Sequence, residues 1–189
     1  MRVLIAEDEA VIRETVNRTL QALGHQVVAE ARTSAEAKAL TRACAPDCAL
    51  VDVRMDGDAG FDATSRIAGA RICPVVMIAA HAQEETMREA SEAGAFAFVT
   101  KPFAETDLAA AVEIATHRFE DMRALEAQIK QMKDRITQQR VIDRAKFLLM
   151  ETGATEEEAF ARMRKASMDT RKPLREVAEA IILSRRIIN

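Results

Sequence analysis

The chain has 189 residues, of which 49% are hydrophobic and 30% charged, and its formal net charge is −3. The length allows one domain of about 120 residues and a smaller second one. No apolar run approaches the roughly 18 residues of a membrane span, and the chain starts directly on a strand pattern, RVLIA, so we expect no signal peptide.

The charge is unevenly distributed. Residues 1–118 carry 12 basic and 18 acidic side chains, whereas residues 119–189 carry 15 and 12. From Ala159 onward the count is 8 basic against 3 acidic side chains. The basic tail is typical of a protein with a polyanionic partner, although a solvated helix surface gives the same excess.

The first hundred residues alternate between strand and helix patterns. Short apolar runs at residues 3–6, 27–31, 49–51, 75–78 and 97–99 are separated by segments with helical periodicity. Gly24 and Gly94 stand where helices are expected to end, and Thr33 with Glu36 predicts a capping box. Five such units predict an α/β fold with a five-stranded parallel sheet covered on both faces.

A long helix is expected after Pro102, because no glycine or proline occurs again until Gly153. Part of it shows heptad spacing, in Met122, Leu125, Ile129, Met132 and Ile136. This pattern favours a coiled-coil dimer, and an amphipathic helix packed on its own domain is the alternative.

A compact helical unit is expected from Gln138 onward. Thr155 with Glu158 predicts a capping box for its second helix, with Phe160 on the apolar face, and Pro173 suits the first turn of a third helix that carries Leu183. The predicted domains are residues 1–118, a helical coiled-coil linker at 119–137, and a three-helix unit at 138–189.

Four charged residues follow predicted strands and therefore belong at one edge of the sheet: Glu7, Asp8, Asp52 and Lys101. Three crowded carboxylates repel one another unless a hard divalent cation joins them. Mg²⁺ suits such a sparse pocket, with Asp8 and Asp52 as direct ligands and Glu7 acting through water. Asp52 is then the expected nucleophile for a phosphoryl group, and Lys101 pairs with that group once it is attached.

The cysteines and histidines carry no expected chemistry. Three cysteines without CxxC spacing predict reduced thiols and a cytoplasmic location: Cys44, Cys48 and Cys73. Each histidine is expected to be structural or to face solvent: His25, His81 and His117.

The front part of the chain, from Arg2 to about Arg118, resembles the receiver domain of two-component response regulators. The resemblance rests on VLIAEDE, LVDVRM and the GAFAFVTKPF stretch. It implies a flavodoxin-like (CheY-like) fold, phosphorylation of Asp52 by a sensor histidine kinase, and completion of the metal site by the backbone carbonyl of Arg54.

Two departures from this family stand out. Ala79 takes the place of the switch threonine or serine, and its aromatic partner is Phe98, which has no hydroxyl. The loop after Asp52 carries Asp56 instead of the usual proline and adds Asp58. We expect Asp52 still to accept phosphate, with weaker coupling between phosphorylation and output.

The tail resembles the ANTAR domain of transcription antitermination regulators, from RVIDRAKFLLM through TEEEAFARMRKASMDTRKPLREVAEAII, with Phe147 where glycine is common. This implies binding to paired RNA hairpins in nascent transcripts. The candidate contacts are Arg144, Lys146, Arg164, Lys165, Arg171, Lys172 and Arg175. At least two of Phe119, Phe147 and Phe160 are expected on apolar faces, so no aromatic stacking platform is predicted.

The sequence therefore predicts a dimeric, non-enzymatic response regulator that binds RNA. In the alternative, the helical tail docks on a protein partner. A DNA-binding activator is less favoured because no helix-turn-helix spacing is evident. Catalysis on a metabolite is least favoured because no nucleophile–base pair or glycine-rich cofactor loop occurs.

Overall fold

The computed structural model describes residues 1–55, 59–81 and 83–188. It divides into two compact units, Met1–Arg123, called here the front unit, and Ala124–Asn189, called the tail unit. Within the described ranges, no helix is both long enough and apolar enough to cross a membrane.

The front unit alternates strands and helices in the predicted order. The elements are β1 (Arg2–Ala6), α1 (Ala10–Ala22), β2 (Gln26–Ala31), α2 (Ser34–Cys44), β3 (Cys48–Asp52), α3 (Ala59–Ala70), β4 (Val75–Ala79), α4 (Glu84–Glu92), β5 (Ala97–Thr100) and α5 (Glu105–Met150). All five predicted strands are confirmed to within two residues at each end, and so is the long helix after Pro102.

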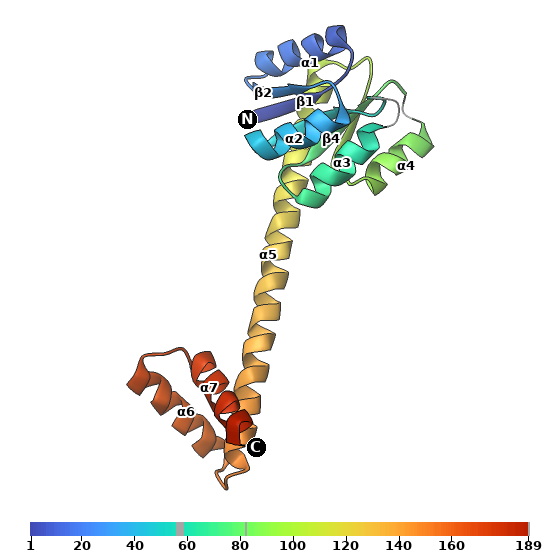
Figure 1. Ribbon diagram of the computed structural model, residues 1–189. Helices are drawn as coiled ribbons and strands as arrows, with labels where there is room; N and C mark the ends of the chain where they lie inside the picture. Colours follow the sequence, from blue (N-terminus) through green and yellow to red (C-terminus); the bar gives the residue numbers. More distant parts are fainter. Residues whose placement is uncertain (56–58, 82, 189) are drawn as a thin grey trace. The chain divides into compact units, whose positions relative to one another are not determined.

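The five strands form one parallel sheet in the order β2-β1-β3-β4-β5 (Figure 1). The order in which strands are added to the sheet changes direction at β1: β2 lies on one side of β1, and β3 lies on the other side. Open α/β sheets bind ligands at the carboxyl ends of the strands on either side of such a point. The topology therefore brings the ends of β1 and β3 together, as predicted for Glu7 and Asp52.

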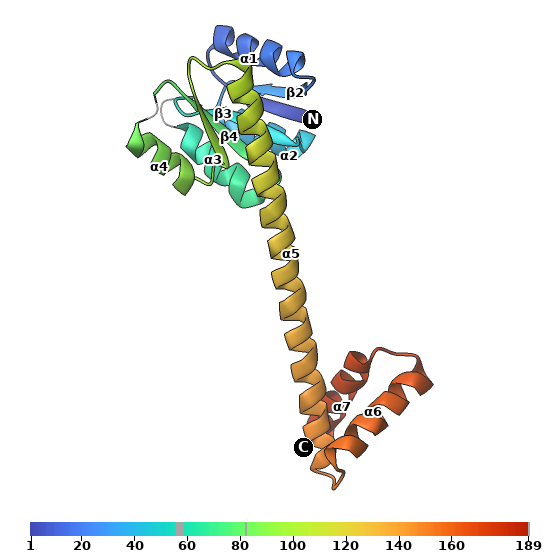
Figure 2. The same cartoon turned by 180° about the vertical axis from the view of Figure 1, so that it is seen from behind.

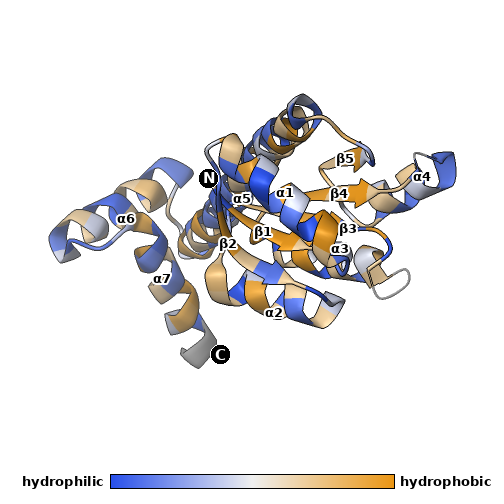
Figure 3. Ribbon diagram, turned by 90° about the horizontal axis from the view of Figure 1, so that it is seen from above, coloured by the Kyte–Doolittle hydropathy of each residue, from blue (hydrophilic) through white to orange (hydrophobic). Residues whose placement is uncertain are grey.

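The sheet is covered on both faces because its strand side chains alternate between two cores. Leu4, Val51 and Met77 lie in the core with α2, α3 and α4. Val3 and Leu50 lie in the core with α1 and the first turns of α5. Figure 2 shows these two layers from behind, and in Figure 3 the apolar strands lie between the helices. Because nearly all of their residues are apolar, the strands pack against the helices on both faces of the sheet.

The predicted capping box at the start of α2 forms only in part. The Thr33 hydroxyl accepts a hydrogen bond from the Glu36 N–H at 3.2 Å. The Glu36 carboxylate, however, accepts from the backbone N–H of Arg32 at 2.8 Å, one residue earlier than predicted.

The tail unit packs the end of α5 against α6 (Glu156–Thr170) and α7 (Leu174–Ile188). Its core is built on Ala145, Met163 and Ala178. The capping box at the start of α6 is confirmed: Thr155 accepts from the Glu158 N–H at 3.2 Å, and the Glu158 carboxylate accepts from the Thr155 N–H at 3.0 Å.

Two large side chains predicted to lie on apolar faces of the tail unit are exposed instead. Phe160 is 41% exposed and Leu183 is 56% exposed. The prediction was wrong because the core of this unit is built on Ala145, Met163 and Ala178, and neither Phe160 nor Leu183 packs against it. Phe147 is also 60% exposed, which leaves Phe119 as the only buried one of the three phenylalanines considered for RNA stacking.

Four of the five predicted heptad residues of α5 form an exposed apolar stripe on the tail unit, while the fifth, Met122, is partly buried in the front unit. Leu125, Ile129, Met132 and Ile136 are each between 43% and 63% exposed. We call these four residues the seam. Since side chains of the tail unit leave the seam exposed, packing within this unit does not account for it.

The three cysteines are free thiols. Cys48 and Cys73 are buried in the two cores of the front unit. Burial raises the pKa of Cys73 to about 12 and also raises the pKa of Cys48. Both thiols are therefore protonated and unreactive at neutral pH.

Candidate functional site

Three of the four charged residues predicted to meet at the sheet edge do meet there: Glu7, Asp52 and Lys101. Asp52 ends β3 and is 5% exposed, and Glu7 directly follows β1 and is 1% exposed. Lys101 follows β5, and its Nζ lies 2.7 Å from Oε2 of Glu7 and also pairs with Oδ2 of Asp52. One ammonium thus joins two buried carboxylates from separate strands.

Backbone groups hold this arrangement from three sides. The Arg54 N–H donates to Oδ1 of Asp52 at 2.7 Å, and the Glu9 N–H donates to Oε1 of Glu7 at 3.2 Å. The Lys101 N–H donates to the Ala79 carbonyl at 2.7 Å, which ties the start of the β5–α5 loop to the end of β4. The functional side chains are therefore oriented before any ligand binds.

The two buried carboxyls have opposite electrostatic environments. Burial, followed by the hydrogen bond with Asp52, raises the pKa of Glu7 to about 7. Burial also acts to raise the pKa of Asp52, but hydrogen bonds with Glu7, Lys101 and the Arg54 N–H outweigh it, so that pKa lies below its ordinary value. Asp52 is therefore the ionised carboxylate of the pair at neutral pH, as a nucleophile must be.

The carboxylate chemistry of this edge fits a hard cation, although the side chains do not yet converge on one point. Among the residues that the structure describes, no three acidic, histidine or cysteine side chains are grouped closely enough to enclose a metal. Asp8 is exposed and, within the same residues, has no side-chain partner, while Lys101 lies against Glu7 and Asp52. Asp8 and Asp52 oxygens would hold Mg²⁺, with Glu7 and the Arg54 carbonyl beside them.

Two acids that the sequence places near this site, Asp56 and Asp58, lie outside the described residues.

The predicted switch positions lie on neighbouring strands. Ala79, at the end of β4, is buried and offers no hydroxyl to the site. Phe98, on β5, is half-buried and packs against the core that contains Ala79. His81, which follows β4, is exposed, in agreement with its predicted solvent-facing position.

The first turn of α3 approaches the end of β3 closely at Gly60. A Cβ atom at this position would lie 2.6 Å from the Val53 carbonyl oxygen and would also overlap the carbonyl of Asp52. Only glycine allows this contact between α3 and the end of β3.

One buried charge at this site was missed by the sequence-based reasoning. Arg13, on α1, donates from Nη1 to the Glu7 carbonyl at 2.8 Å. A signal was available: residues 13, 16 and 20 share one helical face, and Val16 and Leu20 are buried core residues. A charged residue at a core position requires buried partners.

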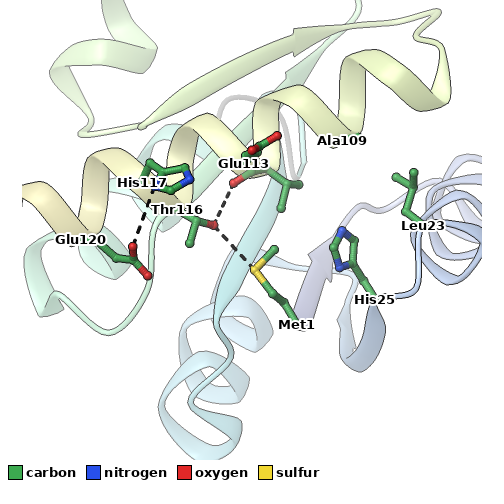
Figure 4. Close-up of a pocket in the computed structure, with 9 residues that line it drawn as sticks. Met1, Leu23, His25, Ala109, Glu113, Thr116, His117 and Glu120 are labelled. Carbon is green, nitrogen blue, oxygen red and sulfur yellow. Dashed lines mark hydrogen bonds and ion pairs between the residues drawn. The ribbon is translucent and has the colours of Figure 1, made fainter.

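A separate cavity of about 400 Å³ lies where Met1 and His25 face α5 (Figure 4). Burial and the positive charge of the chain's amino terminus lower the pKa of His25. The cavity contains none of the acids at the carboxyl ends of the strands, so it does not belong to the site of Asp52.

The basic residues proposed for RNA binding divide into two groups in the tail unit. Five are exposed and, among the described residues, form no ion pair: Arg144, Arg164, Lys165, Arg171 and Lys172. Arg171 is in the left-handed conformation that ends α6, with φ of 54°. These five side chains are available to bind an anion.

The other two basic residues are engaged in ion pairs. Lys146 lies 2.8 Å from Glu156 and 3.0 Å from Asp143, and these two hydrogen bonds raise its pKa. Arg175 lies 2.8 Å from Glu179, one turn away on α7. Lys146 therefore joins α5 to the start of α6, a structural role that the sequence did not reveal.

Comparison with protein families supports the two-part organisation. Residues 3–113 match the model of the response regulator receiver domain, and residues 130–182 match that of the ANTAR domain. Receiver domains generally bind Mg²⁺ at their phosphorylation site.

Known proteins resemble the chain over both parts or over the front part alone. It is 40% identical over 182 residues to the transcriptional regulatory protein PdtaR of Mycobacterium tuberculosis, which covers 96% of this chain and 89% of PdtaR. The signal receiver domain of a modulated diguanylate cyclase from Desulfovibrio desulfuricans is 30% identical, with a TM-score of 0.58 over 63% of this chain and 95% of that one. The receiver domain of the response regulator NarL from M. tuberculosis is 32% identical, with a TM-score of 0.54 over 61% and 95% of the two chains. The chain belongs to the two-component response regulators in which a receiver domain precedes an ANTAR domain.

Proposed function

We propose that this response regulator accepts a phosphoryl group on Asp52 from a sensor histidine kinase and, in response, binds RNA hairpins in nascent transcripts so that a terminator does not form. The pairing of buried Asp52 with Lys101, at the switch point of a receiver sheet, is the observation that carries the first half. The family is one of regulators and not of catalytic enzymes.

The phosphoryl transfer follows from the protonation states at the site. An ionised oxygen of Asp52 attacks phosphorus, forming an O–P bond as the N–P bond to the kinase histidine breaks. The electron pair of the broken N–P bond stays on the kinase imidazole, which leaves as a neutral ring because its other nitrogen carries the proton. Lys101, now paired with Asp52, then pairs with the new phosphoryl oxygens, and Mg²⁺, when bound, neutralises charge on the transferring group.

Coupling between this site and the output is weakened by the residue at position 79. A hydroxyl there would form a charge-assisted hydrogen bond with a phosphoryl oxygen, worth about 1.5–3 kcal/mol. Ala79 forgoes that bond, and Phe98 has no hydroxyl through which to signal. We infer that phosphorylation shifts the output less completely here than it would with threonine at this position.

The RNA surface is assigned to the exposed basic residues of the tail unit. Arg164 and Lys165 on α6, with Arg171 and Lys172 after it, present positive charge without an acidic partner among the described residues. Lysine and arginine hold RNA chiefly through its phosphates, so binding should weaken steeply with salt.

Dimerisation through the seam would double this surface. Four exposed apolar side chains at heptad spacing suit a second copy of the same helix. Linking two weak RNA sites raises their effective concentration on a target with two hairpins. The seam covers residues 125–136, fewer than two heptads, so the pairing is weak alone and can be controlled by the front unit.

A protein partner for the tail unit is the second candidate. Phe147, Phe160 and Met168 are exposed apolar side chains, and such side chains are typical of protein contacts. This candidate predicts binding that changes little with salt.

The test compares the wild type with Asp52→Asn, each with and without acetyl phosphate and Mg²⁺. Probes are an RNA with two adjacent hairpins, an unstructured RNA of equal length and a DNA duplex. We expect labelling of the wild type alone, and tighter binding of the two-hairpin RNA by labelled protein. Equal labelling of both proteins, or binding that persists in Arg164→Ala/Lys165→Ala and ignores salt, would contradict the proposal.

A further inference from the structure

Arg13 is a buried charge that no step of the proposed phosphoryl transfer uses. Among the residues that the structure describes, the buried charged side chains are Glu7, Arg13 and Asp52, and Arg13 is 7% exposed. Removing a guanidinium from water is costly unless its donors are satisfied. The partners of Arg13 therefore indicate why it is there.

These partners are the backbone of the two residues that carry the site's acids. Nη1 of Arg13 donates to the Glu7 carbonyl at 2.8 Å and to the Asp8 carbonyl at 3.3 Å. The Glu7 N–H in turn donates to the Ala31 carbonyl of β2 at 3.1 Å. Residue 7 is thus held by the sheet on one side and by Arg13 on the other.

The guanidinium is itself fixed in orientation by a second pair of residues. Its Nε lies 3.1 Å from Oε2 of Glu30, near the end of β2. Oε1 of Glu30 accepts a hydrogen bond from the Asn17 amide at 2.6 Å. Because the guanidinium is planar, anchoring Nε on Glu30 directs Nη1 at the loop carbonyls.

We propose that Arg13 is a positioning residue of the phosphoacceptor site: it holds the Glu7–Asp8 loop so that both carboxylates face Asp52 when Mg²⁺ binds. This inference rests on the proposed function. Without Arg13 the loop loses two hydrogen bonds on its inner side, and the acids must be ordered by the cation itself. The cost of this ordering makes cation binding less favourable.

The experiment measures Mg²⁺ binding to the full chain by calorimetry, together with the midpoint of thermal unfolding. The variants are Arg13→Gln, which keeps one amide donor, and Arg13→Lys, which keeps the charge but not the fork. Val16→Ala is the matched control, because Val16 lies on the same helix face and is buried in the core. It lowers stability without touching the loop.

We expect Arg13→Gln to weaken Mg²⁺ binding by about tenfold or more, as outer partners of metal ligands do. Arg13→Lys should weaken it less, and Val16→Ala should leave it within about twofold of the wild type despite a lower midpoint. Unchanged Mg²⁺ affinity in Arg13→Gln would overturn the inference, as would an equal loss in Val16→Ala. If the wild type itself does not bind Mg²⁺, the proposed metal site fails and the inference falls with it.

Discussion

Nζ of Lys101 lies 2.7 Å from Oε2 of Glu7 while the same ammonium pairs with Asp52. Lys101 therefore has two carboxylate partners, and phosphorylation of Asp52 would change the balance between them. After phosphorylation, the Lys101 ammonium either keeps its ion pair with Glu7 or pairs with the phosphoryl group instead. The two carboxyls consequently respond differently to pH and to substitution.

Glu7 should make the metal-free protein less stable as pH rises. Its pKa is about 7 in the folded protein, raised first by burial from an ordinary 4.5. The folded state thus binds a proton more tightly than the unfolded state, so this contribution is complete below about pH 4.5 and is lost as pH rises through about 7. Without Mg²⁺, Glu7→Gln should exceed the wild type in unfolding free energy by roughly 1–3 kcal/mol at about pH 8.

The measurement is urea unfolding in a chelator at several pH values. The difference between Glu7→Gln and the wild type should vanish at about pH 4. Glu14→Gln, which makes the same substitution at an exposed position on α1, serves as the control. A lower stability of Glu7→Gln than of the wild type at high pH would show that the Lys101 pair outweighs burial.

Gly60→Ala should displace the backbone around Asp52. The added Cβ would lie 2.6 Å from the Val53 carbonyl oxygen, so α3 must move away from β3. We expect a loss of about 1–3 kcal/mol in unfolding free energy and slower labelling of Asp52 by acetyl phosphate.

Gly69→Ala is the matched control on the same helix, because among the described residues no atom beyond its chain neighbours and its own helix backbone lies within 4 Å of a Cβ atom at that position. It should keep the labelling rate and raise stability by about 0.5–1 kcal/mol. Similar labelling by the two variants would mean that the Gly60 contact does not position Asp52.

Ala79→Thr should strengthen the coupling of phosphorylation to RNA binding. The new hydroxyl supplies a bond to the phosphoryl group worth about 1.5–3 kcal/mol, which corresponds to about a tenfold or larger change in an equilibrium constant. The ratio of RNA dissociation constants without and with acetyl phosphate should rise accordingly. Ala80→Ser adds a hydroxyl at the exposed neighbouring position and should leave the ratio unchanged.

Ile129→Glu should prevent dimerisation while leaving the fold intact. Ile129 is 43% exposed in the middle of the seam, so the charge meets solvent in a monomer but would be buried between two copies. Sedimentation with acetyl phosphate should show a dimer for the wild type and a monomer for Ile129→Glu, with equal melting temperatures at protein concentrations too low for dimerisation. Ala127→Glu, which places the same charge away from the seam, should still dimerise.

The sequence patterns predicted the strands because a strand of a parallel sheet is buried on both faces, so nearly all of its residues are apolar. They also located Glu7, Asp52 and Lys101, since the ends of parallel strands meet at one edge. The capping box of Thr155 and Glu158 was equally visible, because it depends on residues three positions apart. The Phe160 prediction failed for the opposite reason: helical periodicity gives the direction of a side chain but not the distance to the next helix.

The sequence by itself determined which residues we propose for the phosphoryl chemistry, because a carboxylate and a lysine at the ends of parallel strands are recognisable from type and position along the chain. Tertiary structure alone decided how they are held. Arg13 reaches two loop carbonyls through an orientation set by Glu30, and Lys146 is engaged by Asp143 and Glu156. Such roles depend on partners that are distant in sequence or on another element, and neither composition nor periodicity records those distances.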